Sequence, residues 1–378
     1  MKTPRPDNPV SRRQFIGQLS AAAAVALTAR SARAADAPAP SKNLGIALVG
    51  LGSYSEGRLA PALQETKHCH LAGVVTGSRS KGLEWARKYG FSEKNVFGYD
   101  TMAQIAGNPD IDVVYVVTPN SLHAGHCIAA AKAGKHVITE KPMATSVADC
   151  DAIIAACRDA GVRLMVGYRL HYEPHTMELC RLARENVFGP FMKISCENGF
   201  DMSSDANAQN TWRLDKKLAG GGPLMDMGVY VVQAVCMTKA EAAPVAVTAS
   251  FGPVTRPKVF SEVEEEINWT MEFADGAVAK CRATYGAQWS KLRADAAHGW
   301  AELEYPAFYY DEPILKTSQG KPHFPNVNHQ VVQMDGMVRE ILTGQPSAAP
   351  GEMGRRDITI TDAIYAAAAS GGRVEVKA

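Results

Sequence analysis

Short apolar segments alternate with helical segments from residue 44 to residue 166, and this alternation constrains the fold more than any other feature of the chain. The first segment, Leu44–Val49, is a continuous apolar run, as expected for a parallel strand that is buried on both faces. Further strands are expected at 71–75, 113–117, 136–139 and 163–166, with helices at 56–66, 81–89, 102–107, 121–133 and 146–160. This order predicts an α/β domain with a doubly wound parallel sheet, the Rossmann arrangement, over residues 42–166.

The pattern changes after residue 166, where longer strand-like segments replace the alternation. They lie at 192–198, 245–251, 264–273 and 277–285, between expected helices at 174–185, 330–342 and 356–369. Asp275-Gly276 separates the last two strands and is a strong hairpin signal. Residues 167–378 are therefore expected to form a C-terminal α+β domain on a mostly antiparallel sheet, which would serve substrate binding and oligomerisation.

The N-terminus has the layout of a secretion signal. Arg12-Arg13 precedes a short apolar, alanine-rich run, and Ala32-Arg33-Ala34 matches a small-residue cleavage site. The apolar run is too short to span a bilayer. Residues 1–34 are predicted to be a twin-arginine signal that brings the protein, folded and with any cytoplasmic cofactor, to the periplasm; the alternative is a basic disordered tail.

Composition narrows the class of ligand. The chain has 40 basic and 39 acidic residues, so no global field attracts nucleic acid or an anionic membrane, and a small neutral substrate fits better.

The eight cysteines are scattered without a C-x-x-C pair, as is typical of buried thiols. His171 and His175 have a metal-ligand spacing, but Pro174 interrupts the helix and no third ligand is suitably spaced, so no metal site is predicted.

A glycine turn after the first strand indicates a nucleotide site. Gly50-Leu51-Gly52-Ser53-Tyr54-Ser55 lies between a strand and a helix, where glycines let backbone amides and the helix N-terminus approach a pyrophosphate. Ser55 stands where the full pattern has its third glycine, so an ordinary glycine turn is the alternative. After the second strand, Thr76-Gly77-Ser78-Arg79 contains no carboxylate for a ribose diol, while Arg79 and Lys81 could bind a 2'-phosphate. NADP is therefore favoured over NAD, unless Arg79 and Lys81 are simply solvated.

Lys141, Asp226 and Tyr230 are the expected catalytic residues. Lys141 follows a strand at the carboxyl edge of the sheet, and Pro142 restricts its backbone. Asp226 and Tyr230 are four residues apart on a helix that Pro223 would begin, so their side chains share one face. Tyr230 would take the proton of a sugar's anomeric hydroxyl as hydride leaves that carbon, with its phenolate stabilised by Lys141 and the nicotinamide cation and with Asp226 orienting the sugar or the base. The alternative is that Tyr230 packs in the core and Asp226 is a helix-start charge.

Two further segments are candidates for the same cleft. His123, in Pro119-Asn120-Ser121-Leu122-His123, is expected to start a helix beside the nicotinamide. Trp212-Arg213 would place an aromatic plane and a forked donor at the cofactor or the sugar, or would form only a cation–π pair.

These motifs resemble the glucose-fructose oxidoreductase and aldose-aldose oxidoreductase branch of the Gfo/Idh/MocA oxidoreductase family, which also includes inositol dehydrogenases. The likeness runs from about Leu44 to the C-terminus, and its most specific pieces are 49–54, 119–124, 134–137, 140–150, 167–172 and 212–230. It implies a tightly held NADP that one sugar reduces as a lactone forms and a second sugar reoxidises as it becomes a polyol. The implied catalytic group is Lys141, Asp226 and Tyr230.

The expected cofactor-binding residues combine the resemblance with the glycine turn and the ends of the strands. They are Gly50, Gly52, Ser53, Tyr54, Thr76, Gly77, Ser78, Arg79, Lys81, Tyr99, Thr118, Pro119, Asn120, His123, Glu140, Lys141, Arg169, Trp212 and Arg213.

Two departures from the type member of this branch bear on assembly and substrate. The N-terminus expected after cleavage is short, whereas the type member has a long proline-rich arm that covers a neighbour's cofactor; a dimer or a tetramer is expected. The 197–202 stretch also differs, which bears on sugar preference. Rival functions are a sugar dehydrogenase that uses free cofactor, an exported NAD-dependent glycosidase of the same family, and a non-catalytic NADPH sensor.

Overall fold

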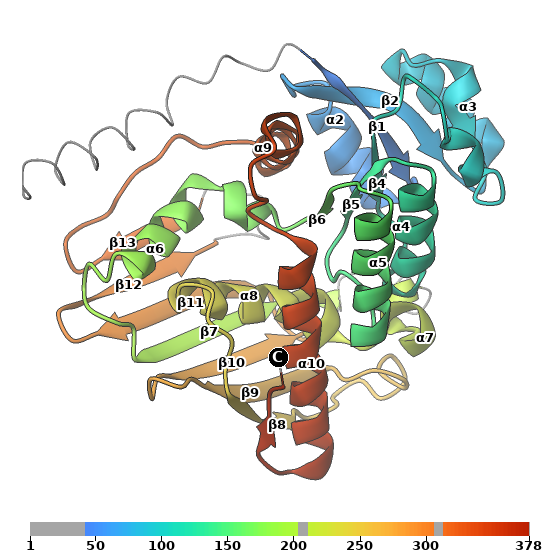
Figure 1. The fold of residues 1–378 in the computed structure, drawn as a ribbon. Coiled ribbons are helices and arrows are strands. Elements are labelled where there is room, and N and C mark those ends of the chain that lie inside the picture. Colours follow the sequence, from blue (N-terminus) through green and yellow to red (C-terminus); the bar gives the residue numbers. More distant parts are fainter. Residues whose placement is uncertain (1–41, 203–210, 306–312, 378) are drawn as a thin grey trace, which may run out of the picture. The chain divides into compact units, whose positions relative to one another are not determined.

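A six-stranded parallel sheet organises the first part of the chain, as the alternating pattern predicted (Figure 1). The computed structural model describes residues 42–202, 211–305 and 313–377, so the expected signal at 1–34 lies outside the described residues. The strand order is β3-β2-β1-β4-β5-β6, and the central strand β1 (Leu44–Val49) is buried at all of its positions. The chain reverses direction across the sheet at β1, and ligands of doubly wound folds bind beside that point.

The other elements of this part match the expected segments closely. The strands are β2 (Cys69–Val75), β3 (Val96–Phe97), β4 (Val113–Val116), β5 (His136–Thr139) and β6 (Leu164–Val166). The helices are η2 (Ser55–Leu59), α2 (Ala60–Ala62), α3 (Arg79–Tyr89), η3 (Glu93–Asn95), η4 (Met102–Ile105), η5 (Asn120–Leu122), α4 (His123–Lys132) and α5 (Val147–Asp159). The helix expected at 56–66 ends at Ala62 and opens with a wide π turn, and the one expected at 102–107 is a short 3-10 helix. The short elements η3 and β3 were not expected.

An eight-stranded, mostly antiparallel sheet organises the second part, in the order β13-β12-β11-β7-β10-β9-β8-β14. The strands are β7 (Lys193–Gly199), β8 (Ala246–Phe251), β9 (Glu266–Glu272), β10 (Val278–Thr284), β11 (Trp289–Ala296), β12 (Gly299–Glu304), β13 (Ile314–Thr317) and β14 (Val374–Glu375). The β9–β10 hairpin turns at Asp275-Gly276, where Gly276 has a φ of +82°. The exception to the antiparallel pattern is the central pair β7 and β10, which runs parallel.

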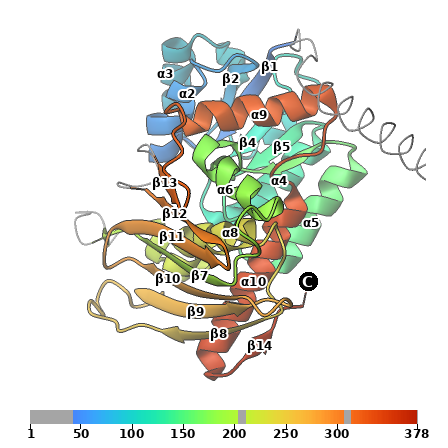
Figure 2. The ribbon, with the colours of Figure 1, turned by 90° about the vertical axis from the view of Figure 1, so that its left-hand side faces the viewer.

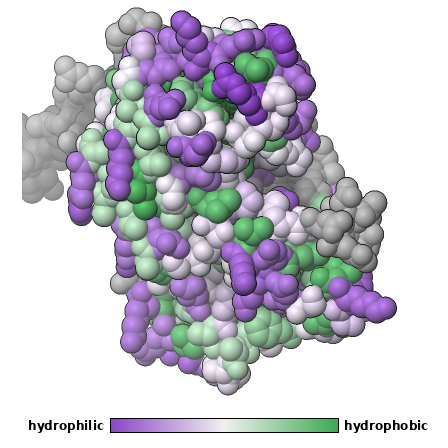
Figure 3. Space-filling model, turned by 90° about the vertical axis from the view of Figure 1, so that its right-hand side faces the viewer, coloured by the Kyte–Doolittle hydropathy of each residue, from purple (hydrophilic) through white to green (hydrophobic). Residues whose placement is uncertain are grey.

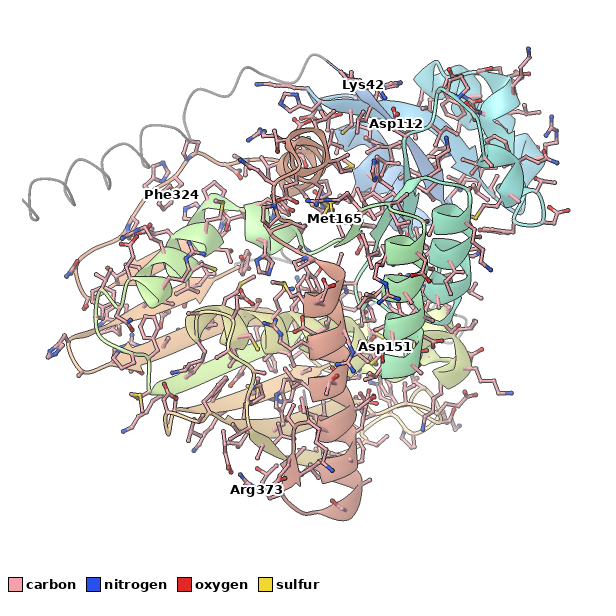
Figure 4. All side chains as sticks on the ribbon, viewed as in Figure 1. Lys42, Asp112, Asp151, Met165, Phe324 and Arg373 are labelled. Atoms are coloured by element: carbon pink, nitrogen blue, oxygen red, sulfur yellow. The ribbon has the colours of Figure 1, made fainter. Side chains whose placement is uncertain are left out.

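Some helices of the second part pack on its own sheet, and others contact the first part. They are η6 (Arg169–Tyr172), α6 (Pro174–Arg184), η9 (Trp212–Leu214), α7 (Lys216–Ala219), η10 (Leu224–Gly228), α8 (Val229–Thr238), α9 (His329–Thr343) and α10 (Gly351–Ser370). Helices α8 and α10 pack against the eight-stranded sheet, whereas α9 lies beside β1 and β2 (Figure 2). The segment between α9 and α10 touches β6, where Pro350 bridges to Met165, and Arg355 of α10 pairs with Asp151 of α5; both Met165 and Asp151 are marked in Figure 4.

The surface and the cysteines agree with a near-neutral chain that has a well-buried core. Hydrophilic and hydrophobic side chains are interspersed on the face drawn in Figure 3. All eight cysteines are buried free thiols, and burial raises the pKa of Cys69, for example, to about 12. Within residues 42–202, 211–305 and 313–377, no helix has the length and apolar character needed to cross a bilayer. Over the same residues, no cluster of histidine, cysteine and acidic side chains is arranged to hold a metal ion.

Candidate active site

A cleft of about 860 Å³ opens at the carboxyl ends of β1, β2, β4 and β5, and the second part of the chain supplies its opposite wall. Its volume is within the range of small-molecule sites. Most of the expected residues line it: Gly50, Gly52, Ser53, Tyr54, Thr76, Tyr99, Thr118, Pro119, Asn120, His123, Glu140, Lys141, Trp212, Arg213, Asp226 and Tyr230. Gly77, Ser78, Arg79, Lys81 and Arg169 are not part of this lining.

The glycine turn after β1 has the geometry of a phosphate cradle. Gly50 has a φ of +95°, and a Cβ atom there would lie 3.0 Å from the carbonyl oxygen of Val117. A Cβ on Gly52 would meet nothing within 4 Å, so it would project into open space at the start of the helix. Ser55 is fully buried, and its hydroxyl donates to the carbonyl of Gly50 at 2.6 Å. The serine that replaces the third glycine therefore fastens the turn, and the amides at the helix start are available to a pyrophosphate.

The end of β2 carries hydroxyls and a lysine rather than a carboxylate. The Thr76 hydroxyl accepts from the amide of Ser78, and the Ser78 hydroxyl accepts from the amide of Lys81, which caps α3. The Lys81 ammonium donates to the carbonyl of Leu51 at 2.8 Å and pairs with Glu56 at 3.1 Å. Lys81 thus ties α3 to the glycine turn. The residues present fit a nicotinamide dinucleotide.

Two loops that follow β4 and β5 are fastened to each other by His123. Its ring nitrogens lie 2.9 Å from the carbonyl oxygen of Pro142 and 2.8 Å from that of Thr118. The ring is buried, and burial lowers the pKa of His123 to about 4. In the same loop the Asn120 amide donates to the carbonyl of Ala219 at 2.8 Å, which connects the first part of the chain to the second.

The structure brings Lys141, Asp226 and Tyr230 together at one end of the cleft. The Lys141 ammonium donates to the backbone carbonyl of Asp226 at 2.8 Å and to its carboxylate at 3.0 Å. It also lies 4.5 Å from the centre of the Tyr230 ring. The Lys141 and Asp226 side chains are only 12% and 14% exposed, so little solvent screens this pair.

Asp226 is held by three donors from separate segments. Besides Lys141, its carboxylate accepts from the Arg213 guanidinium at 2.9 Å and from the Tyr285 hydroxyl at 3.1 Å. Burial raises the pKa of Asp226, but Lys141 and Arg213 lower it more, so the carboxyl titrates well below its usual range. Burial lowers the pKa of Lys141, but Tyr230, Asp226 and Glu140 outweigh burial and the net shift is upward. Lys141 and Asp226 are therefore both charged throughout the neutral range.

Tyr230 is contacted from behind by Arg169. The Arg169 guanidinium donates to the Tyr230 hydroxyl and lies 4.9 Å from the centre of the ring. Arg169 is 1% exposed, so it lies beneath the cleft wall rather than in the lining, where the sequence placed it as a cofactor contact. Tyr230 itself faces the cleft, with cationic groups of Lys141 and Arg169 on its ring.

Comparison with known proteins settles the family. Residues 44–168 match the oxidoreductase family with an NAD-binding Rossmann fold, Gfo/Idh/MocA, and residues 176–301 match the Gfo/Idh/MocA C-terminal domain. The chain belongs to the Gfo/Idh/MocA oxidoreductase family. A Gfo/Idh/MocA chain of this kind combines an NAD(P)-binding Rossmann sheet with the mixed second sheet observed here.

Individual relatives span nearly the whole described chain. The aldose-aldose oxidoreductase of Caulobacter crescentus, solved in complex with glycerol, is 37% identical, has a TM-score of 0.83, and covers 88% of this chain and 100% of its own. The D-xylose 1-dehydrogenase (NADP(+)) of Haloarcula marismortui is 26% identical over 85% of this chain and 90% of its own length. A levoglucosan dehydrogenase solved with NADH and levoglucosan is 23% identical over 89% of this chain and 100% of its own, with a TM-score of 0.77, and shares the fold.

Several site residues of this Gfo/Idh/MocA protein had no signal in the sequence analysis. Tyr285 follows β10 and reaches Asp226 only because the second sheet brings it there. The Glu140 carboxylate accepts from the Tyr115 hydroxyl at 2.6 Å, and Gln333 of α9 donates to Tyr115 at 2.8 Å. Other lining residues lie in segments that the sequence analysis singled out without being named as site residues: Leu51 in the glycine turn, Phe200 and Met202 in the 197–202 stretch, and Met227 beside Asp226. The remaining lining residues are Val117 and Thr211. The only sequence signal for Tyr285, Tyr115 and Gln333 was an aromatic or amide side chain near the end of an element. Many other residues of this chain have the same signal and lie outside the cleft.

Proposed function

We propose that this protein is a sugar oxidoreductase that retains its NADP, oxidises an aldose at the anomeric carbon to the lactone, and reduces a second sugar to a polyol in the same site. The observation that carries the proposal is the meeting of Lys141, Asp226 and Tyr230 in a cleft that the glycine turn after β1 also lines. The likeness to an aldose-aldose oxidoreductase over 88% of the chain supports the sugar class.

Tyr230 is the proposed general acid–base. A bound nicotinamide would supply the hydride acceptor for the aldose C1 and the hydride donor for the second sugar. Tyr230 takes the proton of the C1 hydroxyl in the first half-reaction and returns a proton to the new hydroxyl in the second. The positive charges of Lys141 and Arg169 beside the ring favour the phenolate that accepts this proton, and the neutral phenol that results carries the proton to the second half-reaction.

Asp226 organises charge instead of exchanging protons. Its carboxylate stays ionised because Lys141 and Arg213 hold it, so it cannot act as the general acid near neutral pH. It fixes the Lys141 ammonium next to the Tyr230 ring and holds Arg213 at the cleft wall. Lys141 and Arg213 are thereby held as fixed donors, which stabilise developing negative charge without reorganising during the reaction.

The choice of NADP rests on the end of β2. Residues 76–83, which follow this strand, contain no carboxylate that would compete with a 2'-phosphate, and the ammonium of Lys81 in α3 reaches the glycine turn, where it also pairs with Glu56. The relative from Haloarcula marismortui is named for NADP(+). We propose that the enzyme is exported to the periplasm by the twin-arginine route and works there as a homo-oligomer. Retention of the cofactor would suit this location, because no soluble nicotinamide pool would be needed there.

A sugar dehydrogenase that releases its cofactor is the second candidate. The likeness to a D-xylose 1-dehydrogenase over 85% of the chain favours it. Both candidates use the same catalytic residues and differ in whether the nucleotide leaves between turnovers.

One experiment separates the candidates. The protein is purified without added nucleotide, its near-ultraviolet absorbance is recorded, and an aldose and then a second sugar are added. Reduction of bound nicotinamide by the first sugar and reoxidation by the second would support the two-sugar cycle. Turnover only with added NADP would favour the dehydrogenase. No redox change with any sugar, with or without added NADP, would contradict both.

A further inference from the structure

Glu264 contacts the start of the helix that carries Asp226 and Tyr230. One carboxylate oxygen accepts from the amide of Gly222 at 3.0 Å, and the other accepts from the amide of Leu224 at 3.2 Å. The Tyr365 hydroxyl of α10 donates to the same carboxylate at 2.8 Å. Glu264 lies just before β9, some forty residues from the helix it contacts, so the cap comes from a different element.

The helix needs such a cap because its own first residues cannot supply one. Pro223 stands at the cap position and has no side-chain acceptor. Amides in the first turn of a helix lack intrahelical partners, and a carboxylate placed there is also favoured by the helix dipole. Glu264 fills both needs from outside the helix.

The three glycines before Pro223 are packed too closely for any side chain. A Cβ on Gly220 would lie 2.8 Å from Thr145 in the loop that follows Lys141. A Cβ on Gly221 would lie 2.0 Å from the Tyr365 hydroxyl, and one on Gly222 would lie 2.4 Å from the carbonyl oxygen of Glu264. The turn is thus held between the loop of Lys141 on one side and Glu264 with Tyr365 on the other.

This placement joins the two halves of the catalytic group. The wide turn η10 holds Asp226, and α8 begins one residue before Tyr230. A shift of the helix start would move both side chains relative to Lys141, and displacements of about 1 Å can cost about 100-fold in rate. We propose that Glu264 is a positioning residue, whose carboxylate caps the catalytic helix and fixes Asp226 and Tyr230 opposite Lys141.

Glu264→Gln tests this inference against a matched control, Asp335→Asn. Asp335 likewise accepts from two backbone amides, those of Lys67 and His68, but at the start of β2 and outside the cleft lining. The kinetic readout rests on the proposed function and is the single-turnover reduction of bound nicotinamide at saturating aldose. We expect Glu264→Gln to slow that step about 10- to 100-fold with little change in bound nucleotide or half-saturating sugar concentration. Asp335→Asn should leave the step within about twofold, although each variant lowers the thermal midpoint.

A second readout needs no substrate. Hydrogen exchange of the peptide covering 220–228 should be at least about tenfold faster in Glu264→Gln than in the wild type, and unchanged in Asp335→Asn. Unchanged exchange in Glu264→Gln, or an equal slowing of hydride transfer by both variants, would overturn the positioning role. If the wild type reduces no nicotinamide with any sugar, the proposed function fails, while the exchange comparison still decides whether Glu264 holds the helix.

Discussion

At the scale of single residues, Lys141 has the environment of a fixed charge. Its ammonium is held by the carbonyl and carboxylate of Asp226 and stands against the Tyr230 ring. Removing one partner of a surface ion pair changes the free energy of unfolding little. Removing one partner of a pair that is only about 12–14% exposed destabilises the fold more, because the other charge is left buried. The function of the pair and its contribution to stability therefore have to be tested separately.

Lys141→Met should abolish most hydride transfer without unfolding the protein. Asp226 would keep Arg213 and Tyr285 as donors, so no buried charge would be left alone. Loss of the charge beside Tyr230 should lower the single-turnover rate by about 10²- to 10⁴-fold. Stopped-flow absorbance of the bound nicotinamide measures this rate.

Lys239→Met is the control for that variant. The Lys239 ammonium also donates to a carbonyl, that of Phe191, and pairs with Asp275, and its side chain is 6% exposed. It should lose stability while hydride transfer stays within about twofold of the wild type. Equal loss of rate in both variants would contradict a catalytic role for Lys141.

Asp226→Asn should change how stability depends on pH. Because the folded-state pKa of Asp226 is lowered from its ordinary value of 3.8, its charge stabilises the fold above that value and loses this effect as pH falls towards the folded pKa. Near neutral pH, Asp226→Asn should cost about 1–3 kcal/mol, and the difference from the wild type should shrink below about pH 4. Urea denaturation across the acid range measures it, and a gap that widens on acidification would contradict the assigned sign.

At the scale of elements, both π turns that the structure describes in residues 42–202, 211–305 and 313–377 lie at the cleft. One opens the helix after the glycine turn, over Ser55–Leu59, and the other opens the catalytic helix, over Leu224–Gly228. Wide turns of this kind occur frequently at functional sites. The sequence predicted helices at both places because side-chain periodicity does not separate a wide turn from a regular one.

Gly52→Val and Gly50→Val should separate cofactor binding from stability within one turn. A side chain at Gly52 would enter the open cradle, so the variant should fold normally while its NADP affinity falls at least about tenfold. A side chain at Gly50 meets the carbonyl of Val117 at a φ of +95°, so that variant should lose about 1–3 kcal/mol of stability. Calorimetric titration and thermal melting measure the two effects. Normal NADP affinity in Gly52→Val would contradict a phosphate cradle at this turn.

How far the sequence predicted each element depends on what its residues pack against. Strand β1 could be predicted because both of its faces are buried, whereas β11 has mostly half-exposed positions and gave no clear alternation. Helix α10 begins at Gly351, five residues before the expected start. The sequence placed the start too late because Gly351 and Gly354 lower the helix propensity of this segment. The structure accounts for both glycines: Cβ atoms would lie 2.5 Å from Leu164 and 2.7 Å from Met143.

At the scale of the whole molecule, the site is built from both ends of the chain. Gln330 of α9 donates to the Tyr54 hydroxyl in the phosphate turn, and Gln333 of the same helix reaches Tyr115 beside Glu140. A late helix thus completes the nucleotide-binding part, which the division of the sequence at residue 166 did not foresee.

The position of Lys141 at a strand end and the shared face of Asp226 and Tyr230 could be predicted by rule, and the family resemblance implied that the three residues act together. The Arg169–Tyr230 and Tyr285–Asp226 contacts could not, because they depend on how η6 and the end of β10 lie against the catalytic helix. No local pattern encodes that arrangement, which follows from the packing of the second sheet.

Export of a folded, cofactor-loaded enzyme is a prediction about the whole molecule. The twin-arginine pathway moves folded proteins, and contacts that span the chain, such as Gln330 with Tyr54, can form only after synthesis is complete. Cell fractionation should therefore find the wild type in the periplasm with NADP already bound. Replacing Arg12 and Arg13 by lysine should keep the protein in the cytoplasm with the same nucleotide content and the same single-turnover rate, because the predicted signal precedes residues 44–301, which contain the two matched family domains. Wild-type protein recovered from the periplasm without nucleotide would contradict export of a cofactor-loaded enzyme. A double-lysine variant that still reached the periplasm would rule out the twin-arginine route.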